Sequence, residues 1–177
     1  EGLDGFLAAV TRAETRFDRP SDPPGLWAFL GLPHPFGPDE LLAEVLHPDD
    51  AAMIAELARL MQGGTPTDIT HAARLATMDW HQPGLAHLAL LESILLHGEK
   101  AKNPFAAKRG EFPNKTLRLG ACAHLADPLD RLMCRVEQGR HRRLALEFAL
   151  RSLRLHDFAH HFTRRYAAAK RARGWLD

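Results

Sequence analysis

Eleven histidines make metal binding the first chemistry to consider for this chain of 177 residues. His156 and His160 lie four residues apart, a spacing that places two imidazoles on one face of a helix, where they can share a zinc ion. A closed zinc site needs a third and a fourth ligand, and neither a His-Glu-x-x-His nor a paired Cys-x-x-Cys pattern lies nearby. We therefore expect these histidines to be polar neighbours of an apolar stripe, with no metal and no other cofactor in these residues.

The local motifs of nucleophilic and phosphate chemistry are also absent from the sequence. It contains no Gly-x-Ser-x-Gly elbow, no phosphate-binding loop and no Gly-x-Gly-x-x-Gly, and the turn Gly-Gly-Thr-Pro at 63–66 lacks the lysine of a phosphate loop. Cys122 and Cys134 are too few for a disulfide framework, although the two could pair with each other, and we interpret them as two small buried thiols in a reducing, cytoplasmic setting. The chain by itself is not expected to be a complete enzyme.

The elements that would position any site are predicted to be helices, because no period-two alternation extends beyond three or four residues. The length fits one helical domain over 1–177. No apolar run approaches the roughly 20 residues that span a bilayer, and the N-terminus does not resemble a signal peptide. Prolines, glycines and acidic first turns predict helices over 3–18, 26–30, 38–47, 48–62, 67–80 and 85–97.

The C-terminal stretch from Leu129 to Asp177 is predicted to form a long helix, because all twelve prolines lie at or before Pro128. Gly139, which costs roughly 1 kcal/mol in a helix interior, could split it into 129–138 and 140–173. Two apolar stripes predict that other elements cover this helix on two sides, in an irregular all-α bundle, with Phe158 and Phe162 in the core. The first stripe is Leu144, Phe148, Leu155, Phe158, Phe162 and Tyr166, and the second is Leu146, Leu150 and Leu153.

Charge is divided unevenly along the chain. Residues 1–99 hold five basic and fifteen acidic side chains, a net charge of −10, whereas residues 100–177 hold eighteen and seven, a net charge of +11. Such separation indicates a polyanionic partner for the basic half. The alternatives are a solvated helix face and ion pairs with the acidic half. The candidate contacts lie in a Gly/Pro-rich loop over 98–120 and on the long helix: Lys100, Lys102, Lys108, Arg109, Lys115, Arg118, Arg140, Arg142, Arg143, Lys170, Arg171 and Arg173.

Two segments resemble a known family. The run Tyr-Ala-Ala-Ala-Lys-Arg-Ala-Arg-Gly-Trp-Leu-Asp at 166–177 resembles a basic helix that precedes a Leu-Asp-Phe-Asp-Asp-Leu run in superfamily 1 DNA helicases of the UvrD/Rep type. The loop Ala-Lys-Arg-Gly-Glu-Phe-Pro-Asn-Lys at 107–115 resembles AddA, the helicase subunit of bacterial double-strand break repair helicase-nucleases, in its alphaproteobacterial type. The order of acidic helices, basic loop and arginine-rich helix is similar over most of the chain.

The resemblance implies the 1B subdomain, a helical insertion in the first motor domain that contacts duplex DNA without reading its sequence. ATP and Mg²⁺ would then be bound by other parts of a longer protein, which would act in DNA repair with an AddB-like nuclease subunit. Two other functions remain open from the residues alone. Trp27, Phe29 and Phe36 could dock a partner subunit onto the acidic half, and a free-standing helical metal-dependent hydrolase is the third reading.

Overall fold

The computed structural model describes residues 2–174, without the side chains of residues 14 and 15, and within that range it contains helices and no strand. The all-α class predicted from the sequence is confirmed. The chain divides into two compact units. We call residues 36–144 the central unit, and residues 1–35 together with 145–177 the terminal unit.

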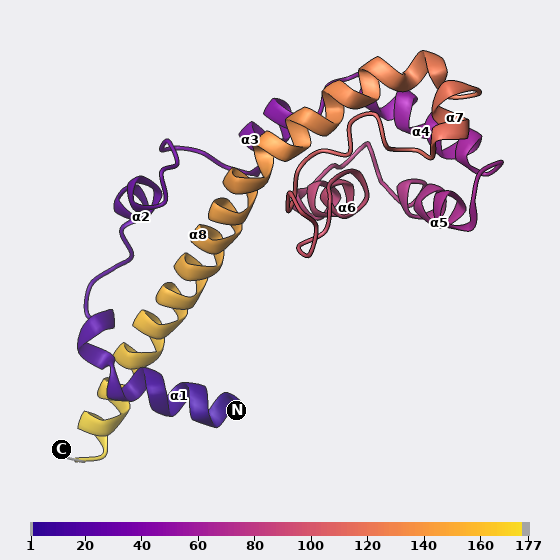
Figure 1. The fold of residues 1–177 in the computed structure, drawn as a ribbon. Coiled ribbons are helices and arrows are strands. Elements are labelled where there is room, and N and C mark those ends of the chain that lie inside the picture. Colours follow the sequence, from indigo (N-terminus) through magenta and orange to yellow (C-terminus); the bar gives the residue numbers. More distant parts are fainter. Residues whose placement is uncertain (1, 175–177) are drawn as a thin grey trace. The chain divides into compact units, whose positions relative to one another are not determined.

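The central unit contains a series of short helices and the first part of one long helix, α8 (Figure 1). Among the short helices, α4 packs against α5, and α6 packs against both α3 and α5. A 3-10 turn, Ala123–Leu125, leads directly into α8. The helices of this unit are α3 (Pro38–Val45), α4 (Asp50–Met61), α5 (Pro66–Leu75), α6 (Leu85–Leu95), α7 (Lys115–Leu119) and the first part of α8 (Ala126–Ala172).

Side-chain caps set where these helices begin. Helix α5 starts with a capping box, in which the backbone N–H of Asp68 donates to Thr65 Oγ1 at 3.3 Å and that of Thr65 donates to Asp68 Oδ2 at 2.9 Å. Asn114 caps α7 by accepting hydrogen bonds from the backbone N–H groups of Thr116 and Leu117 at 2.9 and 3.2 Å. These caps satisfy backbone donors that have no partner inside the helix.

Helix α8 is continuous over 47 residues, so the split at Gly139 that the sequence suggested does not occur. Gly139 is buried where α8 approaches α3, and a Cβ placed on it would lie 2.5 Å from Cγ2 of Val45. Arg135 holds the same approach together, because its Nε donates to the backbone oxygen of Val45 at 2.8 Å. Close packing of the two helices thus explains a glycine in a helix interior.

The core of the central unit is made of aliphatic side chains from α3 to α6 and from the first part of α8. Helix α6 carries little amphipathic pattern because apolar residues face several neighbours at once. Leu129, Leu132 and Met133, in the first turns of α8, complete this core. The largest fully buried side chains are Leu41, Ile54, Leu57, Met61, Leu75, Leu91, Ile94, Leu95, Leu129, Leu132 and Met133.

The terminal unit consists of α1 (Leu3–Arg12), a 3-10 turn (Glu14–Phe17), α2 (Pro23–Phe29) and the remainder of α8. Phe17 joins the N-terminal segment to α8: its ring meets that of His156 edge-on at 5.5 Å, and its carbonyl oxygen accepts a hydrogen bond from His160 Nδ1 at 2.5 Å. Ser21 donates a hydrogen bond to Asp157 at 2.9 Å. The histidine side of α8 is therefore the side that the N-terminal segment covers.

The prediction that both apolar stripes of α8 are buried is wrong for the first stripe. The terminal unit offers only α1, α2 and a 3-10 turn to cover its part of α8, and these short elements cannot enclose a helix on two sides. Phe162 is half-buried, and in the second stripe Leu146 is fully buried, whereas Leu150 and Leu153 are half-buried. The exposed members of the first stripe are Leu144 (40%), Phe148 (56%), Leu155 (51%), Phe158 (47%) and Tyr166 (37%).

Several predicted boundaries also differ from the structure, and helix α2 begins at Pro23, three residues before the predicted start. The first helix ends at Arg12 and continues as a 3-10 turn, whereas the prediction ran to residue 18. Helix α5 begins at Pro66 because Thr65 caps it, and it ends at Leu75, five residues before Trp80. The region 98–120 is not loop throughout, since Asn114 nucleates the short helix α7 within it.

Candidate nucleic-acid interface

The basic loop after α6 is anchored to that helix by its own backbone. The N–H of His97 donates to Ala106 O at 2.9 Å, and the N–H of Lys108 donates to Leu95 O at 3.0 Å. Lys108 Nζ donates to the backbone oxygen of Ile94 at 2.8 Å, and burial lowers the pKa of this half-buried lysine. Lys108 therefore fastens the loop, while the side chains of Lys100, Lys102 and Arg109 are exposed.

Lys115 and Arg118, the two predicted DNA contacts at the end of the loop, differ in their exposure. Lys115, the first residue of α7, is exposed. Arg118 is half-buried, and its Nη1 donates to the carbonyl oxygen of Phe112 at 2.9 Å while its Nη2 pairs with Asp130 at 2.6 Å. The guanidinium of Arg118 thus joins the loop to α8 inside the central unit and is already occupied.

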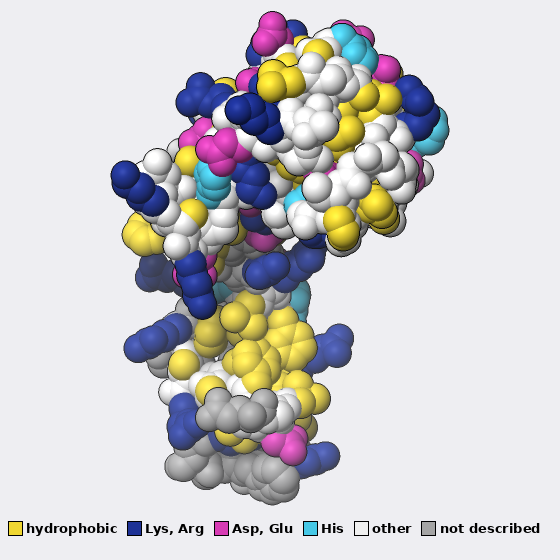
Figure 2. Space-filling model, turned by 45° about the vertical axis from the view of Figure 1, so that its right-hand side comes forward, with side chains coloured by type: hydrophobic (Ala, Val, Ile, Leu, Met, Phe, Trp, Pro, Cys, Tyr) yellow, Lys and Arg dark blue, Asp and Glu magenta, His cyan; other side chains and the backbone are white. Residues whose placement is uncertain are grey.

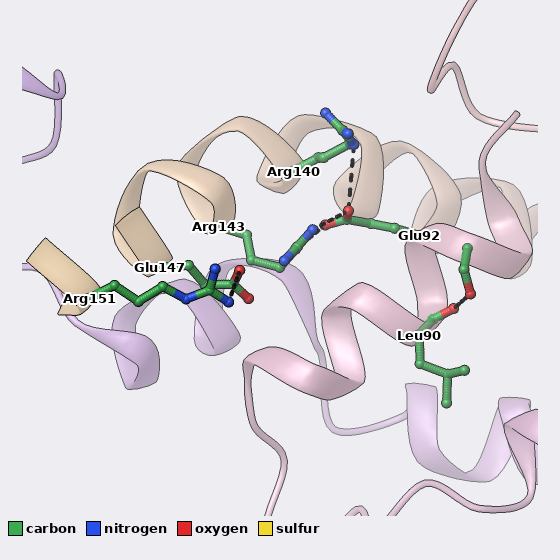
Figure 3. Close-up of polar contacts among 7 residues, drawn as sticks. Leu90, Glu92, Arg140, Arg143, Glu147 and Arg151 are labelled. Atoms are coloured by element: carbon green, nitrogen blue, oxygen red, sulfur yellow. Dashed lines mark hydrogen bonds and ion pairs between the residues drawn. The ribbon is translucent and has the colours of Figure 1, made fainter. Parts of the chain in front are cut away.

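A buried ion pair of the central unit involves two of the predicted DNA contacts. Arg143 and Glu92 are both buried, and Arg143 binds the carboxylate with Nε–Oε1 at 2.5 Å and Nη2–Oε2 at 2.7 Å (Figure 3). Arg140 approaches the same carboxylate, with Nε 3.5 Å from Oε2, and its guanidinium lies 3.6 Å from the centre of the Phe105 ring. A bidentate geometry of this kind is among the strong hydrogen-bond arrangements of arginine.

Arg142, the third member of this cluster, also faces an acid. It pairs with Glu44 of α3 at 2.6 Å, and both side chains are about half exposed. Two turns earlier, Arg135 pairs with the buried Asp50 at 2.6 Å. These contacts favour the alternative in which the arginines of this part of α8 bind acids of the N-terminal half.

The C-terminal cluster lies in the terminal unit. Lys170 Nζ lies 5.5 Å from the centre of the Tyr166 ring, a cation–π arrangement, and Arg171 and Arg173 are exposed. The end of the family-like segment, residues 175–177, lies outside the described residues. The clusters predicted in the sequence therefore divide between two units, with the C-terminal one in the terminal unit and all the others in the central unit.

Four arginines that the sequence did not single out complete the basic surface of the terminal unit. Arg151, Arg154, Arg164 and Arg165 are all exposed on α8. Arg151 lies 3.6 Å from Glu147, one turn away, whereas no carboxylate among the described side chains pairs with the other three. In the sequence these arginines lie between the residues of the first stripe, and the periodicity of that stripe predicted core packing for this part of α8.

His156 and His160 of α8 pack against the N-terminal segment, whereas His141 and His161 are exposed. His160 donates to Phe17 O, and its other contact is the neighbouring ring of His161 at 5.8 Å. Within residues 2–174, no group of three or more His, Cys, Asp or Glu side chains is arranged to hold a metal ion. Cys122 and Cys134 are free thiols, and burial raises the pKa of Cys122, which keeps it protonated and unreactive.

The aromatic residues predicted to dock a partner subunit are mostly inside the protein. Trp27 and Phe36 are each 5% exposed, in contrast to Phe29, which is 82% exposed. The rings of Trp27 and His34 meet edge-on at 6.0 Å within the terminal unit. A docking surface built from all three aromatic rings is therefore not available, and only Phe29 could serve in one.

Comparison of the chain with models of protein families, with curated proteins and with solved structures finds no match. None of the helices in the described part of the chain combines the length and the apolar character needed to cross a membrane.

Proposed function

We propose that the chain is a DNA-contacting accessory region of an AddA-like helicase, equivalent to the 1B subdomain of UvrD/Rep-type motors. One observation carries the proposal: between residues 145 and 174, α8 holds seven Arg and Lys side chains against two acids, and six of the seven are exposed. A surface of this kind gains affinity for nucleic acid through the release of counterions, without contact to base edges. A motor that works on any sequence needs such contacts.

The exposed lysines and arginine of the loop, Lys100, Lys102 and Arg109, form a second candidate contact in the central unit. The resemblance further implies ATP and Mg²⁺ bound by other parts of the parent protein, an AddB-like nuclease partner, and a cytoplasmic setting for DNA repair. This chain has none of the local sequence motifs that bind a nucleoside triphosphate, so we expect no ATP hydrolysis from it alone.

Fluorescence anisotropy of a labelled duplex across a series of salt concentrations tests the proposal. We expect non-specific binding with Kd of roughly 10⁻⁴–10⁻⁶ M, weakening steeply as salt increases. The triple variant R164Q/R165Q/R171Q should reduce the slope of log K against log salt by up to about three, and K100Q/K102Q/R109Q should do the same if the loop contributes.

The matched control is R16Q/R19Q/R59Q, which removes three exposed arginines from the acidic half of the sequence. It should keep both the affinity and the slope of the unmodified chain. Equal affinity in all three variants would show that the exposed cations are only a solvated surface. DNA-stimulated ATP turnover by the pure chain would contradict its assignment as an accessory region.

A further inference from the structure

Three aromatic side chains form a row along α8 in the terminal unit. Phe158 and Tyr166 are exposed and Phe162 is half-buried, and the ring of Phe158 also lies 5.9 Å from that of Phe6 in α1. The centres of the Phe158 and Phe162 rings are 6.2 Å apart with an interplanar angle of 8°, and those of Phe162 and Tyr166 are 5.9 Å apart with an angle of 15°. The residues recur every four positions, which advances them by about 6 Å along a helix. We call Phe158, Phe162 and Tyr166 the aromatic row.

Two neighbouring hollows lie along the aromatic row. One, of about 440 Å³, is lined by Phe158, His161, Phe162 and Arg165. The other, of about 290 Å³, is lined by His161, Arg164, Arg165 and Ala168. The two hollows share His161 and Arg165, so a surface of aromatic rings and a surface of cations meet along one side of the helix.

The cations beside the aromatic row are available to a ligand. Arg154, Arg164 and Arg165 are exposed, and no carboxylate among the described side chains pairs with them. Figure 2 shows the same character on the surface, where hydrophobic side chains gather in one area with Lys and Arg side chains on both sides. A ligand that covers this face must therefore offer apolar planar groups and negative charge at closely spaced points.

We propose that this face of α8 binds single-stranded nucleic acid, with bases stacked on the aromatic row and phosphates held by Arg164 and Arg165. Each nucleotide supplies one planar base and one negatively charged phosphate. These two groups are complementary to the aromatic rings and the arginines that line the two hollows. Stacking on aromatic side chains tolerates any base, because every base has a π-face. The inference rests on the proposed function, since it assumes that this half of α8 contacts nucleic acid.

A single strand fits the aromatic row better than a duplex does. Bases in a duplex follow one another at about 3.4 Å per strand and are closed off by pairing and stacking, so that exposing one costs a few kcal/mol. The rings of the row are 5.9 and 6.2 Å apart, a spacing that only a strand free to extend can match. Duplex contacts, by contrast, require only the cations.

An apolar helix face can also dock a second helix, either from another copy of this chain or from an acidic protein. Against that occupant, Arg151 and Arg165 lie seven residues before and after Phe158, so a seven-residue seam along this face would place an arginine at alternate core positions. Such positions are normally apolar in helix pairs. The charge of this face therefore favours nucleic acid, and self-association becomes an outcome of the test.

The test compares three fluorescein-labelled probes: an oligothymidine of about 16 nucleotides, an abasic strand of the same length, and the corresponding duplex. We expect the chain to bind oligothymidine more tightly than the abasic strand. The double variant F162L/Y166L keeps apolar bulk but removes the aromatic faces, and it should weaken binding of oligothymidine by about tenfold or more while leaving the abasic strand unchanged. R164Q/R165Q should weaken binding of all three probes.

The matched control is F29L, which changes an exposed aromatic residue outside the row and should leave binding unchanged. Photocrosslinking to a strand containing iodouracil provides an independent measurement. After trypsin digestion, the crosslink should appear in the peptides Leu155–Arg164 and Tyr166–Lys170. Melting curves for each variant check that the fold is retained.

Equal affinity for oligothymidine and the abasic strand, with no effect of F162L/Y166L, overturns stacking on the row. If R164Q/R165Q still lowers affinity in that case, the proposed function stands without this inference. Absence of binding to any probe overturns both. If light scattering shows a dimer that F162L/Y166L converts to a monomer, with no crosslink in the two peptides, the face is a contact between copies, and the inference is wrong.

Discussion

Arg143 and Glu92 form a bidentate ion pair in which both side chains are buried, although the two residues are 51 positions apart. The pair joins α8 to α6 inside the central unit and uses an arginine that the charge pattern suggested for DNA. Two buried charges of opposite sign tolerate each other, but either one alone is strongly unfavourable in the same surroundings.

Replacing Glu92 with leucine should therefore destabilise the protein strongly. Arg143 would lose both of its hydrogen bonds to the carboxylate of Glu92, and the free energy of unfolding should fall by about 3–5 kcal/mol, as measured by urea denaturation. The double variant E92L/R143M should recover most of this loss, because it removes both buried charges, and Arg140, which also approaches Glu92, is only half-buried. Arg142→Gln is the control: its pair with Glu44 is half exposed, so a change of at most about 1 kcal/mol is expected.

Gly139→Ala should destabilise the protein even though alanine favours helices. The gain in helix propensity is about 1 kcal/mol, but the new methyl group would overlap Cγ2 of Val45, and overpacking typically costs about 1–3 kcal/mol. Thermal unfolding followed by circular dichroism measures the balance. In V45A/G139A, removal of Cγ2 of Val45 leaves room for the new methyl group, so Gly139→Ala should be tolerated in this background. An increase in Tm for the single variant would show that α3 and α8 are not held this closely.

The two stripes of α8 should respond differently to truncation. Leu146 is fully buried, and Leu146→Ala should reduce the free energy of unfolding by about 2–5 kcal/mol. Phe158 is 47% exposed, so Phe158→Ala should have a smaller effect of about 1–2 kcal/mol, below the value expected for a core phenylalanine. Chemical denaturation of both variants compares them directly. A larger loss for Phe158 than for Leu146 would mean that another part of the protein covers the aromatic row.

Asp68 should make stability depend on pH in the acid range. Burial raises its pKa, but hydrogen bonds from Thr65 and Asn114 outweigh that effect and lower the pKa below its usual value of about 3.9. A lowered pKa in the folded state means that the stabilisation is complete above about pH 3.9 and is lost as the pH falls through the folded value. Stability curves measured from pH 7 to pH 2 should show this loss.

Asp68→Asn removes the charged acceptor and should reduce stability at pH 7 by about 1.5–3 kcal/mol. The difference between the variant and the unmodified protein should narrow at acid pH, where Asp68 is protonated. Asp39→Asn is the matched control, since Asp39 is an exposed carboxylate in the first turn of α3 and should contribute only about 0.3–1 kcal/mol. A constant difference at every pH would assign the effect of Asp68→Asn to packing.

Local signals in the sequence determined most of the helical structure. Pro38 and the acids that follow it marked the start of α3, and the absence of proline after Pro128 marked α8, because these effects act within a few residues of the chain. The sequence also indicated where positive charge accumulates. It could not show that Gly139 continues α8, since that depends on how closely Val45 approaches from α3.

The tertiary structure decided which basic and apolar side chains are available to a ligand. Arg143 and Arg164 are the same residue type, and nothing in the sequence distinguishes them. In the structure Arg143 is buried and pairs with Glu92 of α6, whereas Arg164 is exposed and no described carboxylate pairs with it. Leu146 and Phe158 have the same helical periodicity, yet the first is fully buried and the second is half exposed. Periodicity shows that a helix has an apolar face, but only the other elements of the fold determine whether anything covers it.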